Sequence, residues 1–498
     1  MNRQDVAALC QSPVVPVVFQ KLPAAIGCLS VRVAGLLRSA LAWLFSPRPK
    51  PAHWLVFVFV LAASLALQWR VGQGFVTQTN LDRKTRDQAS YMRMTELNLN
   101  ILLPTVTDGI RNPLFPWLLK PWYAQDREVF FPKAKTVNVV FGMIASVVLG
   151  SYFLLRLPLL PAVFLTVLGT YAAILPVSVF VGAEVVFYLA FFFLWICYCR
   201  LLAVDCLPTY AIGGFVCALA YLAKPSTLLL TLLFLLLSSL RLMKVWEVRK
   251  LRQFAICGSL FLICFLLPVL PRACYSQQLF GDPFESVSAY CFWKDSWDEA
   301  YPHLRYYSKR RIGELPESER PSPGNYWRSH SVQQMTDRML EGIPAQAGNF
   351  FLPENRIKSR KKPSPETRLL VPRRGAYPLA LLSLTLILGF TGGKIADAPE
   401  QRRARLALWA LSGVAFVLHF AAFSFYTPLA SGARFIMATY LPVIFALAAG
   451  LESLRKSFPP GWREALYRAA YLAMAIALFW NLLPLTHATV FGEVNGAF

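Results

Sequence analysis

The chain has 498 residues, of which 56% are hydrophobic and only 15% are charged. A soluble globular protein carries about 25% charged residues, and the mean hydropathy of this chain is +0.46. These values exclude a soluble enzyme and indicate an α-helical protein that crosses the membrane several times. The net charge of +23 does not indicate nucleic acid, because loops and contacts with anionic head groups account for a basic excess in a membrane protein.

Residues 1–53 are expected to form a cytoplasmic N-terminal segment. They hold six basic residues and one acid, Asp5. The apolar stretch 23–45 is interrupted by Arg32 and Arg38, so it is expected to lie on the membrane surface as an amphipathic helix. No secretory signal is expected, since 1–31 lacks a basic start followed by an apolar run and a small-residue cleavage site.

Apolar runs after this segment predict eleven transmembrane helices, since each span needs about 20 apolar residues. The runs lie at 54–67, 137–155, 157–176, 177–199, 208–223, 226–240, 254–270, 377–392, 406–427, 435–451 and 466–483. Basic clusters in the short loops at 241–252, 394–405 and 455–463 assign these loops to the cytoplasmic side. The two long segments 70–136 and 272–376 then face the opposite side as non-cytoplasmic loops.

The predicted fold class is therefore an all-α polytopic membrane protein in four parts. These are the N-terminal segment 1–53, a transmembrane module at 54–271 that includes the first outer loop, the second outer loop at 272–376, and C-terminal helices at 377–498. Cys274 and Cys291 share the second outer loop, where an oxidising compartment would allow them to pair. No Cys/His cluster has the spacing of a zinc site.

The first outer loop contains two charged motifs. Asp87 and Tyr91 are four residues apart, so a helix that begins here presents both on one face. Asp87 also suits the first turn of a helix simply by complementing the helix dipole. The Asp-Gly step at 108–109 predicts a turn, and Arg111 follows it, where it can reach an anionic head group or serve as an interfacial anchor.

Further ionisable residues stand at the ends of apolar runs. Each can be an interfacial anchor, but an ionisable group at membrane depth is costly and is therefore a functional candidate. Under the charge-based topology, one face of the membrane collects Asp87, Arg111, Glu184, Lys224, Arg272 and Arg434. A carboxylate that faces several fixed cations suits chemistry on an amphiphile that carries a phosphate.

These motifs resemble those of the membrane-embedded GT-C glycosyltransferases, especially the broad family of protein O-mannosyltransferases and lipid A aminoarabinose transferases. The resemblance covers about 54–270 and rests on DQASY at 87–91, DGIRNPLFPWLL at 108–119, GAE at 182–184 and AKPS at 223–226, with GARF at 432–435 beyond it. Gln88 replaces a frequent second acid, and Lys224 stands where arginine is frequent. The segment 272–376 matches no family feature, which leaves the acceptor open.

The resemblance implies a GT-C-like fold and transfer of a sugar from a polyprenyl-phosphate-linked donor to an acceptor hydroxyl. Asp87 would be the general base, with support from Tyr91, Asn112 and Glu184. The leaving phosphate would be neutralised by Arg111, Lys224, Arg272 and Arg434. One base with a cationic leaving-group site predicts inversion, whereas retention would need Glu184 as a nucleophile. No cofactor is required, although Asp87 with Glu184 can recruit a divalent metal.

The expected location is a bacterial inner membrane, with a cytoplasmic N-terminus and a periplasmic site. The acceptor is a lipid, a glycan or a protein. Two other functions remain open: a lipid or solute transporter or flippase, and a structural subunit whose exposed aromatic residues anchor partners. The absence of a convincing internal repeat and the gathering of polar residues at one face, rather than at the midplane, favour the transferase.

Overall fold

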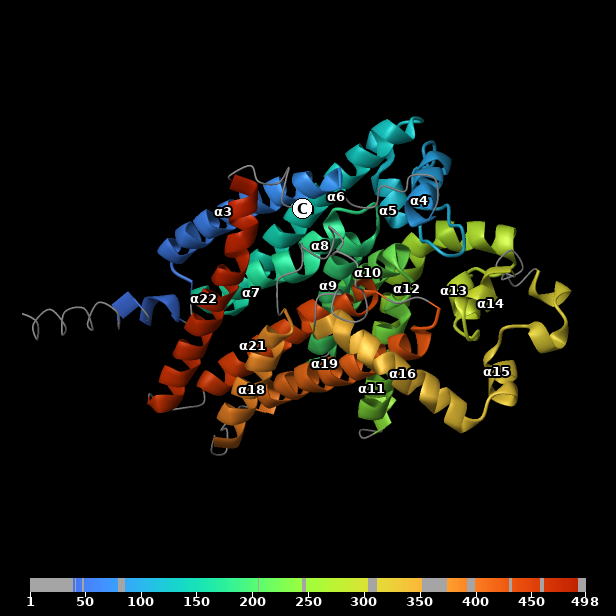
Figure 1. Ribbon diagram of the computed structural model, residues 1–498. Helices are drawn as coiled ribbons and strands as arrows, with labels where there is room; N and C mark the ends of the chain where they lie inside the picture. The colour runs from blue at the N-terminus through green and yellow to red at the C-terminus, as the bar shows by residue number, and fades with distance from the viewer. Residues whose placement is uncertain are drawn as a thin grey trace, which may run out of the picture.

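The computed structural model describes residues 39–46 except 41, 49–78, 86–204, 206–243, 248–302, 311–351, 374–391, 399–429, 432–456 and 461–490. Within these ranges the chain forms helices and loops and contains no strand. The helices pack side by side (Figure 1). The prediction of an all-α protein is confirmed for this part of the chain.

Eight helical spans in these ranges are long and apolar enough to cross a membrane. Six are single helices, and the first five of these are α3 (Pro51–Val76), α6 (Arg127–Arg156), α9 (Glu184–Ala203), α12 (Val248–Phe280) and α19 (Pro399–Tyr426). The sixth is α22 (Trp462–Val490). The other two spans combine shorter elements: α7 (Leu159–Gly169) continues through the π-helical turn η2 (Thr170–Ile174) into α8 (Leu175–Ser178), and α20 (Ala433–Ile436) continues through η7 (Met437–Thr439) into α21 (Tyr440–Lys456). Three shorter apolar helices coincide with the remaining predicted spans: α10 (Leu207–Ala223), α11 (Thr227–Met243) and α18 (Ala376–Thr391).

The buried share of each span distinguishes central helices from peripheral ones. In the span Ala433–Lys456, 83% of the apolar stretch is buried inside the protein, whereas in Arg252–Phe280 only 17% is buried. Peripheral helices expose large apolar side chains such as Phe59, Leu267 and Phe390. Exposure of so much apolar surface to water is unfavourable, whereas contact of the same surface with lipid tails is not. The architecture is therefore that of an integral membrane protein.

Several predicted span boundaries are wrong because the helices continue through polar residues. α3 ends at Val76 instead of 67, where its last carbonyl accepts a hydrogen bond from Lys135 Nζ at 3.1 Å. α6 begins at Arg127 instead of 137 because Asp126 caps it, and α12 continues to Phe280 instead of 270. The predicted span 177–199 is wrong for a different reason: the helix is interrupted, since residues 179–183 are not helical.

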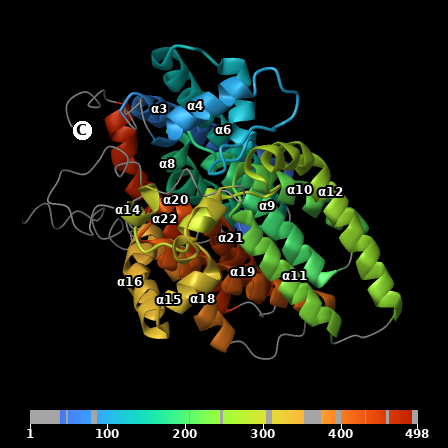
Figure 2. The same ribbon diagram turned by 90° about the vertical axis from the view of Figure 1, so that its right-hand side faces the viewer.

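Shorter helices lie outside the spans. The first group is α4 (Arg86–Leu97), α5 (Leu114–Leu118) and η1 (Lys120–Trp122), and the second is α13 (Val287–Cys291), α14 (Trp297–Ala300), η4 (Ile312–Glu314), η5 (Glu317–Glu319) and α15 (Pro323–Ser329). Both groups lie on the right-hand side of the molecule in Figure 1, and Figure 2 views them from that side. The two long segments between spans thus build one end of the protein.

The second long segment is anchored to the bundle by α16 (Val332–Phe351), which packs along α19. Gly342 allows this approach, because a Cβ there would collide with the carbonyl oxygen of Ser424. Further along, Gln346 Nε2 donates to Thr427 Oγ1 at 3.0 Å, and the Phe350 ring packs on Phe416. The segment therefore has a fixed position on the bundle.

Two smaller predictions concern the N-terminus and the cysteines. Most of the predicted surface helix at 23–45 lies outside the described residues, but Phe45 at its end is buried against Tyr467 of α22. Cys274 and Cys291 are both free thiols in the structure. The disulfide that their shared segment would allow is therefore not formed.

Candidate active site

Asp87 lies at the start of α4, where its carboxylate contacts two arginines from distant parts of the chain. Its Oδ1 accepts a hydrogen bond from Arg111 Nη2, and its Oδ2 accepts one from Arg434 Nη1 at 2.7 Å. The Asp87 side chain is 39% exposed and that of Arg434 is 48% exposed. This ion-paired carboxylate is therefore open to a ligand.

Arg111 is held by the turn that the Asp-Gly step predicted. Asp108 Oδ1 accepts hydrogen bonds from the backbone N–H groups of Ile110 at 2.9 Å and Arg111 at 2.6 Å. Gly109 takes a positive φ of 80°, a conformation that favours glycine. Asp108 Oδ2 accepts from Arg111 Nη1 at 2.7 Å, so one guanidinium joins two carboxylates.

Tyr91 and Asn112 support this turn through their contacts with neighbouring residues. The Tyr91 ring is buried, packs edge-on against Phe115, and has the Arg111 guanidinium 5.9 Å from its centre. The side-chain amide of Asn112 donates to the backbone carbonyl of Tyr221 near the end of α10. The orientation of Asp87 therefore comes from the two arginines, while Tyr91 supports Arg111.

Glu184 and Lys224 form a second ion pair. Glu184 is the first residue of α9 and Lys224 follows the last residue of α10, where Pro225 prevents the helix from continuing. Lys224 Nζ lies 2.7 Å from Glu184 Oε1, and the two side chains are 20% and 9% exposed. A buried pair of this kind is costly to separate, since removal of one partner leaves an uncompensated charge.

Arg434 reaches the site from α20, next to the central span. Gly432 before it has a φ of 152°, which few other residues adopt. The backbone carbonyl of Arg434 accepts a hydrogen bond from the Tyr188 hydroxyl of α9 at 2.9 Å. The backbone at Arg434 is thus fixed to the core, while its guanidinium extends into an accessible position.

Arg272 does not join Asp87. It is buried within α12, and its guanidinium donates to the backbone carbonyls of Pro283 and Glu285, each at 2.7 Å. The loop that Arg272 holds also contacts the Asp-Gly turn at 108–109, because the Val287 N–H donates to the Gly109 carbonyl at 2.8 Å. Arg272 therefore supports the site through the backbone.

Two residues near the cluster were not among the predicted site residues. Asp108 appeared in the sequence as a turn signal and as the first residue of the 108–119 motif, without a role of its own, although an acid three residues before Arg111 can pair with it. Tyr188 stands within an apolar run of α9, and no pattern there indicates its bond to a residue 246 positions away.

Within the described part of the chain, the cluster is electrically balanced. Its ion pairs contain three cations, Arg111, Lys224 and Arg434, and three carboxylates, Asp87, Asp108 and Glu184. The sequence had predicted a basic surplus around Asp87, and the paired side chains of this cluster carry none. An incoming anion therefore has to compete with carboxylates for the arginines.

These charges shift the acidity of the carboxylate and of its neighbour. Burial alone raises the pKa of Asp87, but the positive charges of Arg434 and Arg111 and their hydrogen bonds lower it to about 2 from 3.8. Burial, together with the negative charges of Glu184 and Asp87, raises the pKa of Tyr91. At neutral pH Asp87 is ionised and Tyr91 is protonated.

The lowered pKa of Asp87 predicts a pH dependence of stability. Because the folded-state value is about 2 and the ordinary value is 3.8, the stabilisation is complete above about pH 5 and is lost as the pH falls towards 2. Thermal unfolding of the detergent-solubilised protein, followed by tryptophan fluorescence, measures this. The difference in Tm between the wild type and Asp87→Asn should shrink over that range, and a constant difference would contradict the assigned ion pairs.

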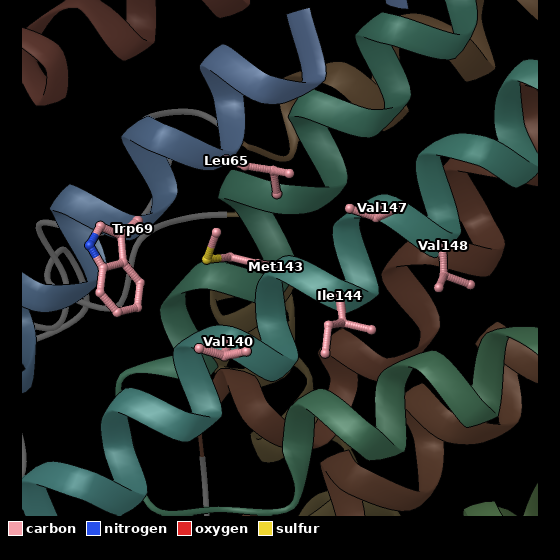
Figure 3. A pocket seen from close by; sticks show the side chains of 7 residues that line it. All are labelled: Leu65, Trp69, Val140, Met143, Ile144, Val147 and Val148. Atoms are coloured by element: carbon pink, nitrogen blue, oxygen red, sulfur yellow. The ribbon is translucent and has the colours of Figure 1, made fainter. Parts of the chain in front are cut away.

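An apolar groove between α3 and α6 offers no comparable chemistry. It has a volume of about 410 Å³ and is lined by Leu65, Trp69, Val140, Met143, Ile144, Val147 and Val148 (Figure 3). None of these side chains can hold a phosphate or accept a proton from an alcohol at neutral pH. The candidate site is therefore the charged cluster.

Within the described residues, no group of three or more His, Cys, Asp or Glu side chains is placed to hold a metal ion. No protein-family model matches the chain, and the search of curated proteins gives no match. The chemistry of the site is therefore inferred from its geometry. An exposed carboxylate between two guanidinium groups can accept a proton, and the guanidinium groups can bind an anion.

Proposed function

We propose that this protein is a membrane glycosyltransferase that moves a sugar from a polyprenyl-phosphate-linked donor to an acceptor hydroxyl. The observation that carries this proposal is the accessible carboxylate of Asp87 between Arg111 and Arg434. Transfer from a lipid phosphate needs a base for the acceptor and cations for the leaving group. The cluster combines both groups at one end of a membrane-embedded bundle.

The proposed reaction is a single displacement. The acceptor hydroxyl transfers its proton to Asp87 while its oxygen bonds to the anomeric carbon of the sugar. The bond between that carbon and the phosphate oxygen breaks, and its electron pair stays on the phosphate. Arg111 and Arg434 stabilise this developing charge, with Lys224 as a further cation. The polyprenyl phosphate then leaves as a stable anion.

Inversion at the anomeric carbon is the favoured outcome. A retaining enzyme needs a second carboxylate that can attack the sugar. The second acid predicted for such a role, Glu184, is only 9% exposed and is bonded to Lys224. This pair is better suited to hold the lysine next to the phosphate than to supply a nucleophile. Asp87 therefore acts as the single base of the proposed mechanism.

The proposed site faces the non-cytoplasmic side, which is the periplasm if the membrane is a bacterial inner membrane. Supporting this orientation, α9 begins at the site with Glu184 and carries Arg200 in its last turn. α21 likewise ends with Arg455 and Lys456. Basic residues at the opposite ends of both helices suit the cytoplasmic side.

The proposal is tested with purified protein in proteoliposomes. The vesicles contain a panel of polyprenyl-phosphate monosaccharides and an extract of envelope lipids and glycans as acceptors. The expected result is release of polyprenyl phosphate together with a new glycoside, detected by mass spectrometry. Passage of a labelled donor across the bilayer with its sugar still attached, and without any covalent product, would instead identify a flippase.

A further inference from the structure

Asp87 is poorly prepared to act as a base in the unliganded protein. Each of its carboxylate oxygens accepts a hydrogen bond from a different arginine, Arg111 on one side and Arg434 on the other. A carboxylate held in this way gains little by taking up a proton, because protonation weakens two charge-assisted hydrogen bonds. A bound ligand therefore has to take Arg111 and Arg434 away from Asp87 before Asp87 can deprotonate an alcohol.

Resting on the proposed function, we propose that the phosphate of the donor lipid frees the catalytic base, Asp87, from its two arginines. On binding, the phosphate takes the guanidinium groups of Arg111 and Arg434 from Asp87 and leaves the carboxylate free to accept the proton of the acceptor. The ligand chemistry is a phosphate group that offers several oxygens to two guanidinium groups.

Both arginines can bind a phosphate while they keep the hydrogen bonds that hold them in place. Arg111 uses separate nitrogens for its two partners, so Nη1 remains on Asp108 when Nη2 leaves Asp87. Arg434 is fixed through its backbone carbonyl by Tyr188, and its guanidinium is half exposed. Asp108 is thus a positioning residue that keeps one guanidinium in place throughout the exchange.

The charge balance of the cluster favours such an exchange. Three carboxylates already neutralise the three cations, and the donor phosphodiester adds one negative charge. During transfer Asp87 loses its negative charge as it takes the proton, while the leaving phosphate gains one. The total charge stays constant and only its position changes, so arginines shared between Asp87 and the phosphate follow the charge as it moves.

Withdrawal of the arginines also changes the acidity of the base. Their charges are what lower the pKa of Asp87 to about 2, whereas burial raises it. Among the described residues, the other charged and titratable groups near Asp87 are Tyr91 on the same helix, Asp108, and the Glu184–Lys224 pair. With a phosphate anion added, the pKa of Asp87 rises, and the carboxylate becomes a stronger base.

The exchange can be measured by carbodiimide labelling, because these reagents modify the protonated form of a carboxyl group. Full-length protein in nanodiscs is labelled at pH 5.5 without ligand, with polyprenyl phosphate, with the uncharged polyprenol, and with inorganic phosphate. Polyprenyl phosphate should accelerate labelling of Asp87 about tenfold or more, since each pKa unit changes the protonated fraction about tenfold. Polyprenol should not accelerate this labelling. Exposed Glu96 on α4 should be labelled at the same rate under all four conditions.

The remaining arms separate the alternatives. Acceleration by inorganic phosphate alone would identify a free phosphate as the releasing ligand, which overturns the lipid as its source. Arg434→Ala should accelerate labelling of Asp87 without any ligand, because one of the two cations is already gone. Binding of polyprenyl phosphate without faster labelling of Asp87 would overturn the exchange and leave the transferase proposal intact. Absence of both binding and sugar transfer would overturn the transferase proposal itself.

Discussion

Replacement of Asp87 by asparagine should strongly reduce sugar transfer while the protein still folds and inserts into the membrane. Asparagine has the same shape but is almost non-basic, so the acceptor proton has no destination. Loss of a positioned general base lowers kcat by about 10²–10⁴-fold. The KM for the donor should stay the same or fall, because an amide competes less than a carboxylate for Arg111 and Arg434. Steady-state kinetics in proteoliposomes separate the two effects.

The matched control for this variant is Glu96→Gln. Glu96 lies on the same helix and is exposed, so loss of its charge should leave kcat and KM unchanged. Size-exclusion chromatography and thermal unfolding verify that both variants are folded. Full activity of Asp87→Asn would show that Asp87 is not the base.

Replacement of Arg434 by glutamine should lower kcat/KM by about 10²–10³-fold, the effect of removing one preorganised donor to a developing negative charge. Arg434→Lys should recover only part of this loss, because lysine keeps the charge but not the planar fork that serves two acceptors. The measurement is the initial rate of polyprenyl phosphate release at several donor concentrations.

Arg328→Gln is the control for the arginine variants, since Arg328 is an exposed residue of α15 that takes no part in the cluster. Its kcat/KM should equal that of the wild type. An unchanged kcat/KM for Arg434→Gln would mean that Arg434 only holds Asp87 in the resting protein and does not contact the phosphate.

The apolar runs predict the class of fold well but its boundaries less well. Hydropathy detects the lipid-facing parts of the helices, yet it cannot show that α6 extends back to a cap at Asp126. Nor does it show the break at 179–183, which is composed of apolar residues and glycine. That break matters for the site, because it makes Glu184 the first residue of α9.

The candidate site was predictable where the signal is local. Asp87 at a helix start and Arg111 after an Asp-Gly turn both lie in one short segment, and the structure brings them into contact. The contact of Asp87 with Arg434 joins residues 347 positions apart. Tertiary structure brings them together, since α20 packs on α16 and α19 and the Arg434 carbonyl accepts a hydrogen bond from Tyr188 of α9. Arg272 has the same charge and the same expected face, yet backbone carbonyls bind it instead. Side-chain charge alone cannot distinguish these two arginines.

The most direct test of the central claim is mass spectrometry of envelope lipids and glycans from three matched cell lines. One produces the wild-type chain, one produces Asp87→Asn at the same level, and one lacks the chain. We expect one glycoside to be present with the wild type and missing from the other two, with its polyprenyl-phosphate sugar donor accumulated in both. The same glycoside in cells that carry only Asp87→Asn, or no difference among the three, would contradict transfer at this site.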